Sequence, residues 1–393
     1  MREIYLDHAA AAPVDPAVTR EVIRGIKIVG NPSSFNDAGR NAAKELLVAR
    51  QKVARFLNAR VDEIVFTASG SESNSLAVFG SVNASGVARG EIVSQPTEHL
   101  SVLEPIGRLN RLGYKVKMAS VDRDGIVSTA DVVKLITSKT ILVSVMYANN
   151  EIGTIQPIAE IGKAIRDFRK KSGSIYPLFH IDACQAAPFL SVDVQNLNVD
   201  LLTFNGSKIY GPRGIGILYV RRGVALEPLI LGGSQERGRR AGTENLPTIL
   251  GLAKVVSLIN PKRDNKKIST LRDYFFSQLT KILPEARING AMGDKRLANN
   301  VNISIPYADS ERLLLELDKY GIRAGSGSAC TAHSVEPSHV LKAIGVKPPY
   351  LDGALRFSLG RRTKKEDMGN LLRKLSQIIK LLKKRYPKSD FIE

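Results

Sequence analysis

Hydrophobic residues recur along this chain at spacings that predict alternating helices and strands. Residues 16–30 and 37–58 show helical spacing, and short hydrophobic runs follow them. The strands predicted from these runs are Ile64–Thr67, Glu91–Ser94, Lys115–Ala119, Ile141–Tyr147, Leu178–Asp182, Asp200–Phe204 and Ile215–Val220, with helices between them at Ser73–Gly80, Leu100–Leu112 and Ile158–Lys171. Several of these strands are hydrophobic throughout, which is typical of strands covered on both faces. The pattern therefore predicts an α/β fold in which a mostly parallel sheet lies between helices.

The pattern changes after about residue 255. The elements expected there are a helix at 267–282, a strand at Asn300–Ile305, a helix at Ser310–Lys319, a strand at Ala354–Ser358 and an amphipathic helix at about 365–386. This order predicts a smaller α+β unit, and the charged stretch Pro261–Lys267 places its boundary nearby. We expect a large domain at 15–258 and a small domain built from residues 1–14 and 259–393.

Length and composition fit a soluble globular protein. The 393 residues exceed what one hydrophobic core normally holds, and 43% of them are hydrophobic and 24% charged. Two cysteines cannot form a disulfide framework and fit a reducing compartment. The first residues lack the apolar segment of a secretory signal, and no apolar run is long enough to span a membrane. We expect a cytoplasmic protein with no membrane partner.

The formal net charge of +19 leaves several partners open. The basic residues cluster modestly at Arg237–Arg240, Arg361–Lys365 and Lys383–Lys388, and no aromatic residues alternate with them as a base-stacking surface requires. A lysine-rich solvated surface explains this charge, as does an acidic protein partner or a nucleic acid such as tRNA. Charge alone does not choose among them.

Polar residues follow the predicted strands where ligands bind in open α/β sheets. A short turn containing Gly70 and Ser71 follows Ile64–Thr67 and opens a helix. The free N–H groups and dipole of a helix N-terminus favour a phosphate, although an ordinary helix cap explains the same residues. Asn149 and Asn150 follow another strand, as turn residues or as ligands.

A carboxylate and a lysine follow two further strands. Asp182 ends a hydrophobic strand and needs a cationic partner, such as a protonated ring nitrogen, with Gln185 three residues later. Lys208 lies in the tight loop Asn205-Gly206-Ser207-Lys208, where partial burial would lower its pKa and favour a Schiff base. An anion site, a carboxylate and a lysine are together what a pyridoxal phosphate site requires.

The sequence around Cys330 points to chemistry at sulfur. Cys330 ends the run Gly-Ile-Arg-Ala-Gly-Ser-Gly-Ser-Ala-Cys, which has little apolar area to bury. A structural thiol normally lies in a packed core, which is the role we expect for Cys184.

The chain resembles class V, fold type I pyridoxal-phosphate enzymes, and within them the cysteine desulfurases of the NifS/IscS group. The resemblance covers essentially the whole length and rests on these motifs: Tyr5-Leu6-Asp7-His8-Ala9-Ala10, Gly30-Asn31-Pro32-Ser33-Ser34, Thr97-Glu98-His99, Asn149-Asn150-Glu151-Ile152-Gly153, Asp182-Ala183-Cys184-Gln185, Lys208-Ile209-Tyr210-Gly211-Pro212, Arg240-Ala241-Gly242-Thr243-Glu244-Asn245, Ser326-Gly327-Ser328-Ala329-Cys330 and Arg356-Phe357-Ser358-Leu359-Gly360. It implies a large domain with a mostly parallel seven-stranded sheet and a smaller α+β C-terminal domain.

The resemblance also implies pyridoxal 5'-phosphate as the cofactor, with no metal. It implies that Lys208 attaches the cofactor and moves protons, that Asp182 keeps the ring nitrogen protonated and that Gln185 bonds the ring hydroxyl. His99 would stack on the ring and act in acid–base steps. The further cofactor contacts implied are Gly70, Ser71, Asn150, Asn205, Ser207 and Thr243.

For the reaction, the resemblance implies that Asn150 and Arg356 bind the carboxylate of L-cysteine. Cys330 would take the sulfur as a persulfide while L-alanine leaves. Thr243 would reach a phosphate across a dimer interface, so that a homodimer shares its two active sites. Family members usually carry Ser-x-His-Lys where this chain has Asn205-Gly206-Ser207-Lys208, so a cationic phosphate donor is absent and weaker cofactor binding is expected.

The leading function is therefore desulfuration of L-cysteine. The sulfur would go to an iron–sulfur scaffold or a sulfur-carrier protein, or serve tRNA thiolation. A selenocysteine lyase or another class V aminotransferase or lyase is the alternative, although an aminotransferase needs no thiol such as Cys330. A non-enzymatic basic scaffold that binds RNA or protein is a second alternative.

Overall fold

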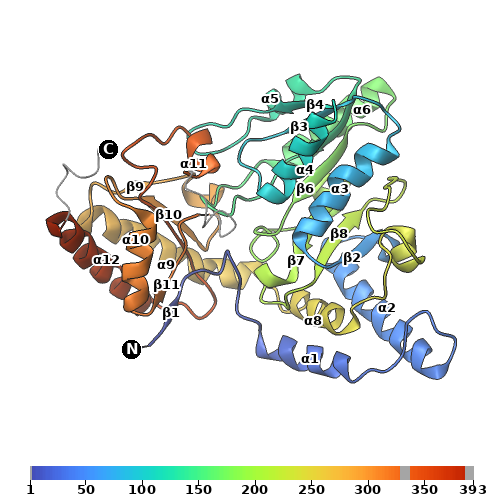
Figure 1. The fold of residues 1–393 in the computed structure, drawn as a ribbon, viewed down its shortest axis with the longest axis horizontal. Coiled ribbons are helices and arrows are strands. Elements are labelled where there is room, and N and C mark those ends of the chain that lie inside the picture. Colours follow the sequence, from blue (N-terminus) through green and yellow to red (C-terminus); the bar gives the residue numbers. More distant parts are fainter. Residues whose placement is uncertain (1, 328–336, 386–393) are drawn as a thin grey trace.

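A seven-stranded sheet lies at the centre of the larger part of the molecule (Figure 1). The computed structural model describes residues 2–327 and 337–385. In spatial order the strands are β2 (Ile64–Thr67), β8 (Gly216–Val220), β7 (Leu201–Asn205), β6 (Leu178–Asp182), β5 (Thr140–Ser144), β3 (Glu91–Ser94) and β4 (Lys115–Met118). All neighbours pair in parallel except β8, which is antiparallel to both β7 and β2. The mostly parallel sheet expected from the sequence is confirmed.

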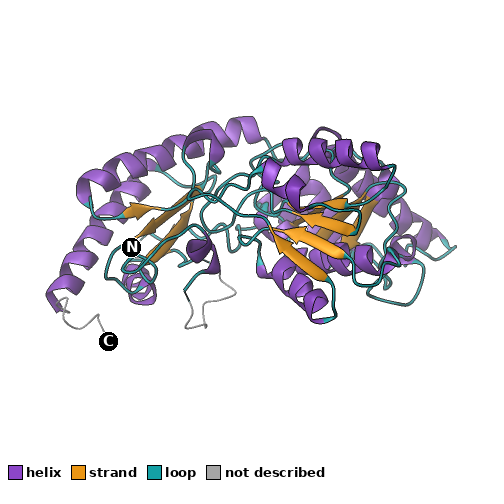
Figure 2. Ribbon diagram, turned by 90° about the horizontal axis from the view of Figure 1, so that it is seen from above, coloured by secondary structure: helices purple, strands orange, loops and turns teal. Residues whose placement is uncertain are grey.

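Helices cover both faces of this sheet (Figure 2). They are α1 (Pro16–Ile26), α2 (Asp37–Leu57), α3 (Gly70–Ala84), α4 (Leu100–Arg111), α5 (Thr129–Leu135), α6 (Ile158–Ser172), α7 (Val194–Leu197) and α8 (Leu246–Val256). Alternate strand residues enter two separate hydrophobic clusters. Val65 belongs to the cluster with α3 and α4, whereas Phe66 belongs to the cluster with α2, α6 and α8. Burial on both faces explains why the strands are hydrophobic throughout.

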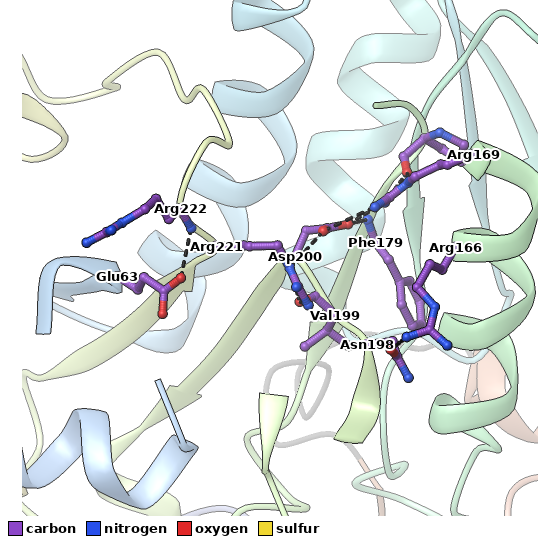
Figure 3. Close-up of polar contacts among 10 residues, drawn as sticks. Glu63, Arg166, Arg169, Phe179, Asn198, Val199, Asp200, Arg221 and Arg222 are labelled. Carbon is purple, nitrogen blue, oxygen red and sulfur yellow. Dashed lines mark hydrogen bonds and ion pairs between the residues drawn. The ribbon is translucent and has the colours of Figure 1, made fainter. Parts of the chain in front are cut away.

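A buried carboxylate ties the amino-terminal ends of the central strands together (Figure 3). Asp200 accepts the N–H of Phe179 at 2.7 Å and pairs with Arg169 and, at 3.2 Å, with Arg221. These contacts join α6, β6, β7 and the end of β8. The buried charge of Asp200 is therefore paired within the fold, at the end of the sheet opposite the carboxyl ends of the parallel strands.

The smaller part contains a three-stranded antiparallel sheet of order β12-β10-β9. Its strands are β9 (Arg287–Ile288), β10 (Asn300–Ser304) and β12 (Ala354–Ser358), and its helices are α9 (Pro261–Ile282), α10 (Ser310–Lys319), α11 (His339–Ala343) and α12 (Lys365–Arg385). Near the N-terminus, β1 (Ile4–Tyr5) pairs in parallel with β11 (Ile322–Arg323). The division into 15–258, and 1–14 with 259–393, stays a prediction.

Helix α9 begins earlier than the sequence pattern indicated. The pattern started it at 267 and placed a boundary stretch at Pro261–Lys267, but Pro261 is the first helical residue. A backbone N–H in the first turn of a helix has no acceptor within the helix, so proline, which has no N–H, loses no hydrogen bond at this position. The side chain of Asn260 caps the helix by accepting the N–H of Arg263 at 3.1 Å. The polar residues of Pro261–Lys267 form a largely exposed face of α9.

Across residues 2–327 and 337–385, no helix is long and apolar enough to cross a membrane.

Candidate active site

The carboxyl ends of β6 and β7, the start of α3 and residues 9–10 enclose a cavity of about 190 Å³. The cavity brings together these residues predicted from the sequence: Gly70, Ser71, His99, Asn150, Asp182, Gln185, Asn205, Ser207, Lys208 and Arg356. Thr243 lies elsewhere, and Cys330 lies outside the described residues. These side chains come from distant parts of the sequence because the carboxyl ends of parallel strands meet at one edge.

Asp182 is held in place by two hydrogen bonds. Its Oδ2 accepts the side-chain N–H of Asn74 at 2.7 Å, and its Oδ1 accepts the N–H of Cys184 at 2.9 Å. Asn74, in α3, is fully buried and was missed by the sequence analysis; its only signal was its place in the first turns of the helix that opens with Gly70. A fixed, buried carboxylate at the cavity wall favours a cation beside it.

His99 enters the cavity as a neutral imidazole. It is the N-cap of α4, and its Nδ1 accepts the N–H of Ser101 at 3.1 Å and contacts the Ser101 hydroxyl at 2.8 Å. Burial lowers the pKa of His99, and the positive charge of Lys208 lowers it further, against the opposing effect of Asp182. Because Nδ1 accepts a hydrogen bond, the neutral ring carries its proton on Nε2.

Lys208 ends a short 3₁₀ turn directly after β7. The Asn205 side chain caps this turn by accepting the N–H of Lys208 at 3.2 Å. The Lys208 Nζ donates to the carbonyl oxygen of Ala10. The loop is so tight that a Cβ on Gly206 would overlap the carbonyl oxygen of Pro212. These contacts place the amine in the cavity.

The start of α3 forms a corner of the cavity that is suited to an anion, here called the anion-binding corner. Gly70 and Ser71 are the first residues of the helix, and both line the cavity with Asn205 and Ser207. A Cβ on Gly70 would lie 2.9 Å from the Asn205 Nδ2 and 3.0 Å from the Cys184 Sγ. Glycine therefore leaves the space into which the first N–H groups of the helix and the neighbouring amide and hydroxyl groups can bind an anion.

Cys184 lines the same cavity as a buried thiol. Burial raises its pKa well above the usual range, and the charge of Asp182 raises it further. The group is therefore protonated at neutral pH, which fits the packing role expected from the sequence rather than a nucleophile.

Arg356 reaches the cavity from β12 of the smaller sheet. Its side chain is 2% exposed, and it pairs with Asp7 at 2.8 Å and donates to the carbonyl oxygen of Asn150 at 3.2 Å. Its Nε is buried with no hydrogen-bond partner among the described residues. Asp7 was missed as a site residue, although it lies in a recognised motif. Gln185 donates to the carbonyl oxygen of Ala9 at 2.9 Å, so the N-terminal segment forms part of the site.

Glu98 is a further buried acid that the sequence analysis did not assign a role. Glu98 is fully buried. Its Oε1 accepts the N–H of Met146 and, at 3.3 Å, the side-chain N–H of Gln95. Its Oε2 has no hydrogen-bond partner within the described part of the chain. Burial raises the pKa of Glu98 to about 8, with a contribution from the charge of Asp182. Glu98 is therefore largely protonated at pH 7.

Thr243 lines a second cavity, of about 260 Å³, beside β2. Arg240 lines it too and pairs at 2.9 Å with Glu72 in the first turn of α3. The loop that carries Thr243 is thus joined to the helix of the anion-binding corner. The predicted contact of Thr243 with a phosphate on another subunit stays a prediction.

A buried ion pair supports the same loop. Glu236 is 5% exposed and binds Arg50 through both carboxylate oxygens at 2.6 Å. It also accepts the N–H of Phe66 at 3.0 Å. Glu236 and Arg237 both have positive φ angles, 47° and 59°, which is costly for residues other than glycine. The pair with Arg50 offsets this cost and holds the loop against β2.

Comparison with known proteins identifies close relatives. The sequence profile of the family described as Aminotransferase class-V matches residues 4–371. A protein named cysteine desulfurase IscS from Dictyoglomus turgidum is 41% identical over 385 residues, covering 97% of this chain and 96% of that protein. A solved NifS-like protein has a TM-score of 0.89 at 33% identity and covers 97% of this chain and 100% of its own. The structure described as SspA in complex with cysteine has a TM-score of 0.78 at 32% identity, with 91% and 98% covered.

Proposed function

This chain belongs to the class-V aminotransferase family, and on that premise we propose that it is a cysteine desulfurase, which converts L-cysteine to L-alanine and keeps the sulfur as a persulfide. The observation that carries the proposal is 41% identity to a named cysteine desulfurase over 97% of the chain. The cavity supports it because an amine, a buried carboxylate, a neutral histidine and an anion-binding corner lie together there.

The chemistry of the cavity fits pyridoxal phosphate. The corner at Gly70 and Ser71 suits its phosphate, Asp182 suits a protonated ring nitrogen, and the amine of Lys208 suits its aldehyde. When bound, the cofactor supplies an electron-withdrawing ring that stabilises negative charge at the α carbon of an amino acid. Asn205 and Ser207 provide uncharged donors near the phosphate.

The protein's own groups then handle protons. Lys208 would hold the cofactor through its amine, and the same amine, when free, would carry a proton to and from the substrate's α carbon. His99 would lie against the cofactor ring and has its Nε2 proton to donate to a substrate atom, while Ser101 fixes the orientation of the imidazole. Gln185 and Asn74 complete the polar wall.

Arg356 and Asn150 bind the substrate carboxylate in this proposal. The planar guanidinium offers two parallel N–H groups to a carboxylate, and Asp7 holds it from the other side. The buried Arg356 Nε without a partner among the described residues supports a ligand at this position.

Cys330 is the nucleophile of the sulfur transfer. Its thiolate attacks the substrate sulfur, so that an S–S bond forms while the Cβ–S bond breaks. The electron pair of the broken bond remains with the carbon skeleton, which takes up protons and leaves as alanine. The persulfide then passes to an acceptor, which we propose is an iron–sulfur scaffold, a sulfur-carrier protein or the tRNA thiolation machinery. We further propose a cytoplasmic homodimer in which Thr243 contacts the partner's cofactor.

A single-turnover reaction tests the function. Protein loaded with pyridoxal phosphate is mixed with L-cysteine, and alanine and protein-bound sulfane sulfur are measured beside Cys330→Ala. We expect one alanine and one labile sulfur per chain, located by mass spectrometry on the Cys330 peptide and not on the Cys184 peptide. Alanine that survives in Cys330→Ala would indicate a lyase instead. A protein that forms neither product and gains no cofactor absorbance would favour a non-enzymatic scaffold.

A further inference from the structure

The Glu151 carboxylate contacts described residues on both sides of the segment 328–336. Glu151 follows the cavity residue Asn150, is 2% exposed and lies in the turn after β5. Its Oε2 accepts the hydroxyl of Ser338 at 2.6 Å. A Cβ on Gly327 would lie only 2.9 Å from the same oxygen. One buried carboxylate therefore contacts the chain where it leaves for residues 328–336 and where it returns.

A second contact fixes the returning chain in the same place. The Nε2 of His339 lies 2.9 Å from the carbonyl oxygen of Glu98, which directly precedes His99. Ser338 is also the N-cap of α11 and accepts the N–H of Leu341 at 3.2 Å. The start of α11 is therefore bonded to two turns that also supply cavity residues.

The backbone of Glu151 is held without help from its carboxylate. Its N–H donates to the side chain of Asn149 at 2.8 Å, and its carbonyl oxygen accepts side-chain N–H groups of Asn300 at 2.8 Å and Asn302 at 3.1 Å. A change in the carboxylate or its partner should therefore leave Asn150 and the substrate cavity in place. Among residues 2–327 and 337–385, the carboxylate's hydrogen bond goes to Ser338, beside Gly327, so its role differs from that of the cavity residues.

We propose that Glu151 is a positioning residue for sulfur transfer, which acts by hydrogen-bonding Ser338 and packing against Gly327, the described residues on either side of the stretch that carries Cys330. This inference rests on the proposed function, because it assigns Cys330 the sulfur. Fixed ends limit the volume over which a thiol in the intervening chain is distributed, so they raise its effective concentration at the substrate. Loss of the Glu151–Ser338 hydrogen bond should slow transfer to Cys330 without weakening cysteine binding.

Substitutions at Ser338 separate this role from helix capping. Ser338→Asp keeps a good cap for α11 but sets a second carboxylate against Glu151. Ser338→Asn keeps the cap and retains an N–H donor for Glu151. In the double variant Glu151→Gln/Ser338→Asp, the glutamine N–H donates to the aspartate carboxylate, so the hydrogen bond is restored with donor and acceptor exchanged. Thermal melting of each variant checks that it folds.

The experiment uses cofactor-loaded full-length protein. It measures the single-turnover rate of persulfide formation on Cys330 and, separately, the cysteine dependence of the cofactor absorbance change. We expect Ser338→Asp to slow persulfide formation about tenfold or more, because a hydrogen bond to a charged group is lost and replaced by repulsion. Its cysteine dependence should stay unchanged. Ser338→Asn should equal the wild-type protein, and the double variant should recover most of the rate.

Two results would overturn this role alone. One is a Ser338→Asp variant that forms persulfide at the wild-type rate. The other is a double variant as slow as Ser338→Asp, because the effect would then not pass through Glu151. A wild-type protein that releases no alanine and transfers no sulfur would overturn the proposed function and this role with it. The behaviour of the wild-type protein therefore distinguishes the two failures.

Discussion

Replacing Glu98 by glutamine should stabilise this protein, and by an amount that depends on pH. Glu98 is fully buried, and burial with the nearby charge of Asp182 raises its pKa from the ordinary value of 4.5 to about 8. Glutamine has the shape of the protonated acid and keeps an oxygen to accept the N–H of Met146. It cannot ionise, so it removes the cost of keeping a proton on a buried carboxyl group.

The magnitude follows from the two pKa values. Between pH 4.5 and 8 the unfolded chain has lost the Glu98 proton while the folded chain keeps it. The stabilising contribution of the protonated group is thus complete below pH 4.5 and is lost as the pH rises to about 8. Each pH unit in this window costs about 1.4 kcal/mol, so at pH 7 wild-type protein is expected to be about 3 kcal/mol less stable than Glu98→Gln.

Urea denaturation of wild-type and Glu98→Gln protein at pH 5, 6, 7 and 8 measures this difference. The protein is used without cofactor, because a cation beside Asp182 would offset part of the charge that acts on Glu98. The difference in the free energy of unfolding should widen with each pH step. Glu91→Gln is a control of opposite sign, since hydrogen bonds from Lys117 and Thr137 outweigh burial and lower the pKa of Glu91. A Glu98→Gln difference that is the same at all four pH values would refute the reasoning.

Three further substitutions test the site and its supports. Gly70→Ala should lower the affinity for pyridoxal phosphate about tenfold or more, because its Cβ would meet the Asn205 amide at 2.9 Å; an unchanged affinity in an absorbance titration would contradict the anion-binding corner. Arg50→Met leaves the buried Glu236 carboxylate without its cation and should lower the free energy of unfolding by about 3–5 kcal/mol in urea, whereas a loss below about 1 kcal/mol would show that the loop does not need the pair. Asp182→Asn should still bind the cofactor but release alanine about 100-fold more slowly, and near-normal turnover would exclude the proposed partner of the ring nitrogen.

The central sheet could be predicted because its signal is local. Strands β2, β3 and β6 have the predicted bounds, since each is a short hydrophobic run with polar neighbours. The start of α9 was missed because Pro261–Lys267 shows mostly the polar face of a helix, which resembles a linker in sequence. The pairing of β1 with β11 could not be predicted either, because two-residue strands separated by most of the chain leave no periodic pattern.

In the candidate site too, residues with a local sequence signal could be predicted and residues defined by tertiary contacts could not. Asp182 and Lys208 could be proposed from the sequence because Asp182 ends one predicted strand and Lys208 follows the next, and both line the cavity. Asn74, Glu98 and Glu151 gain their importance from tertiary contacts that no spacing reveals. The motifs that contain Glu98 and Glu151, and the place of Asn74 near the start of a helix, do not say which group each residue bonds. Only the folded chain brings Asn74 to Asp182, or Glu151 to the chain on both sides of Cys330.

The parallel pairing of β1 with β11 has a consequence for co-translational folding. Tyr5 pairs with Arg323, and Asp7 meets Arg356, so the segment around residues 5–7 completes its contacts only after residues 323–356 have been synthesised. The strands of the large sheet can assemble while the chain is still growing, because all of them precede residue 221. The proposed pocket for the substrate carboxylate cannot assemble then, because Arg356 is part of it. A chain that ends before residue 356 thus lacks a complete candidate site.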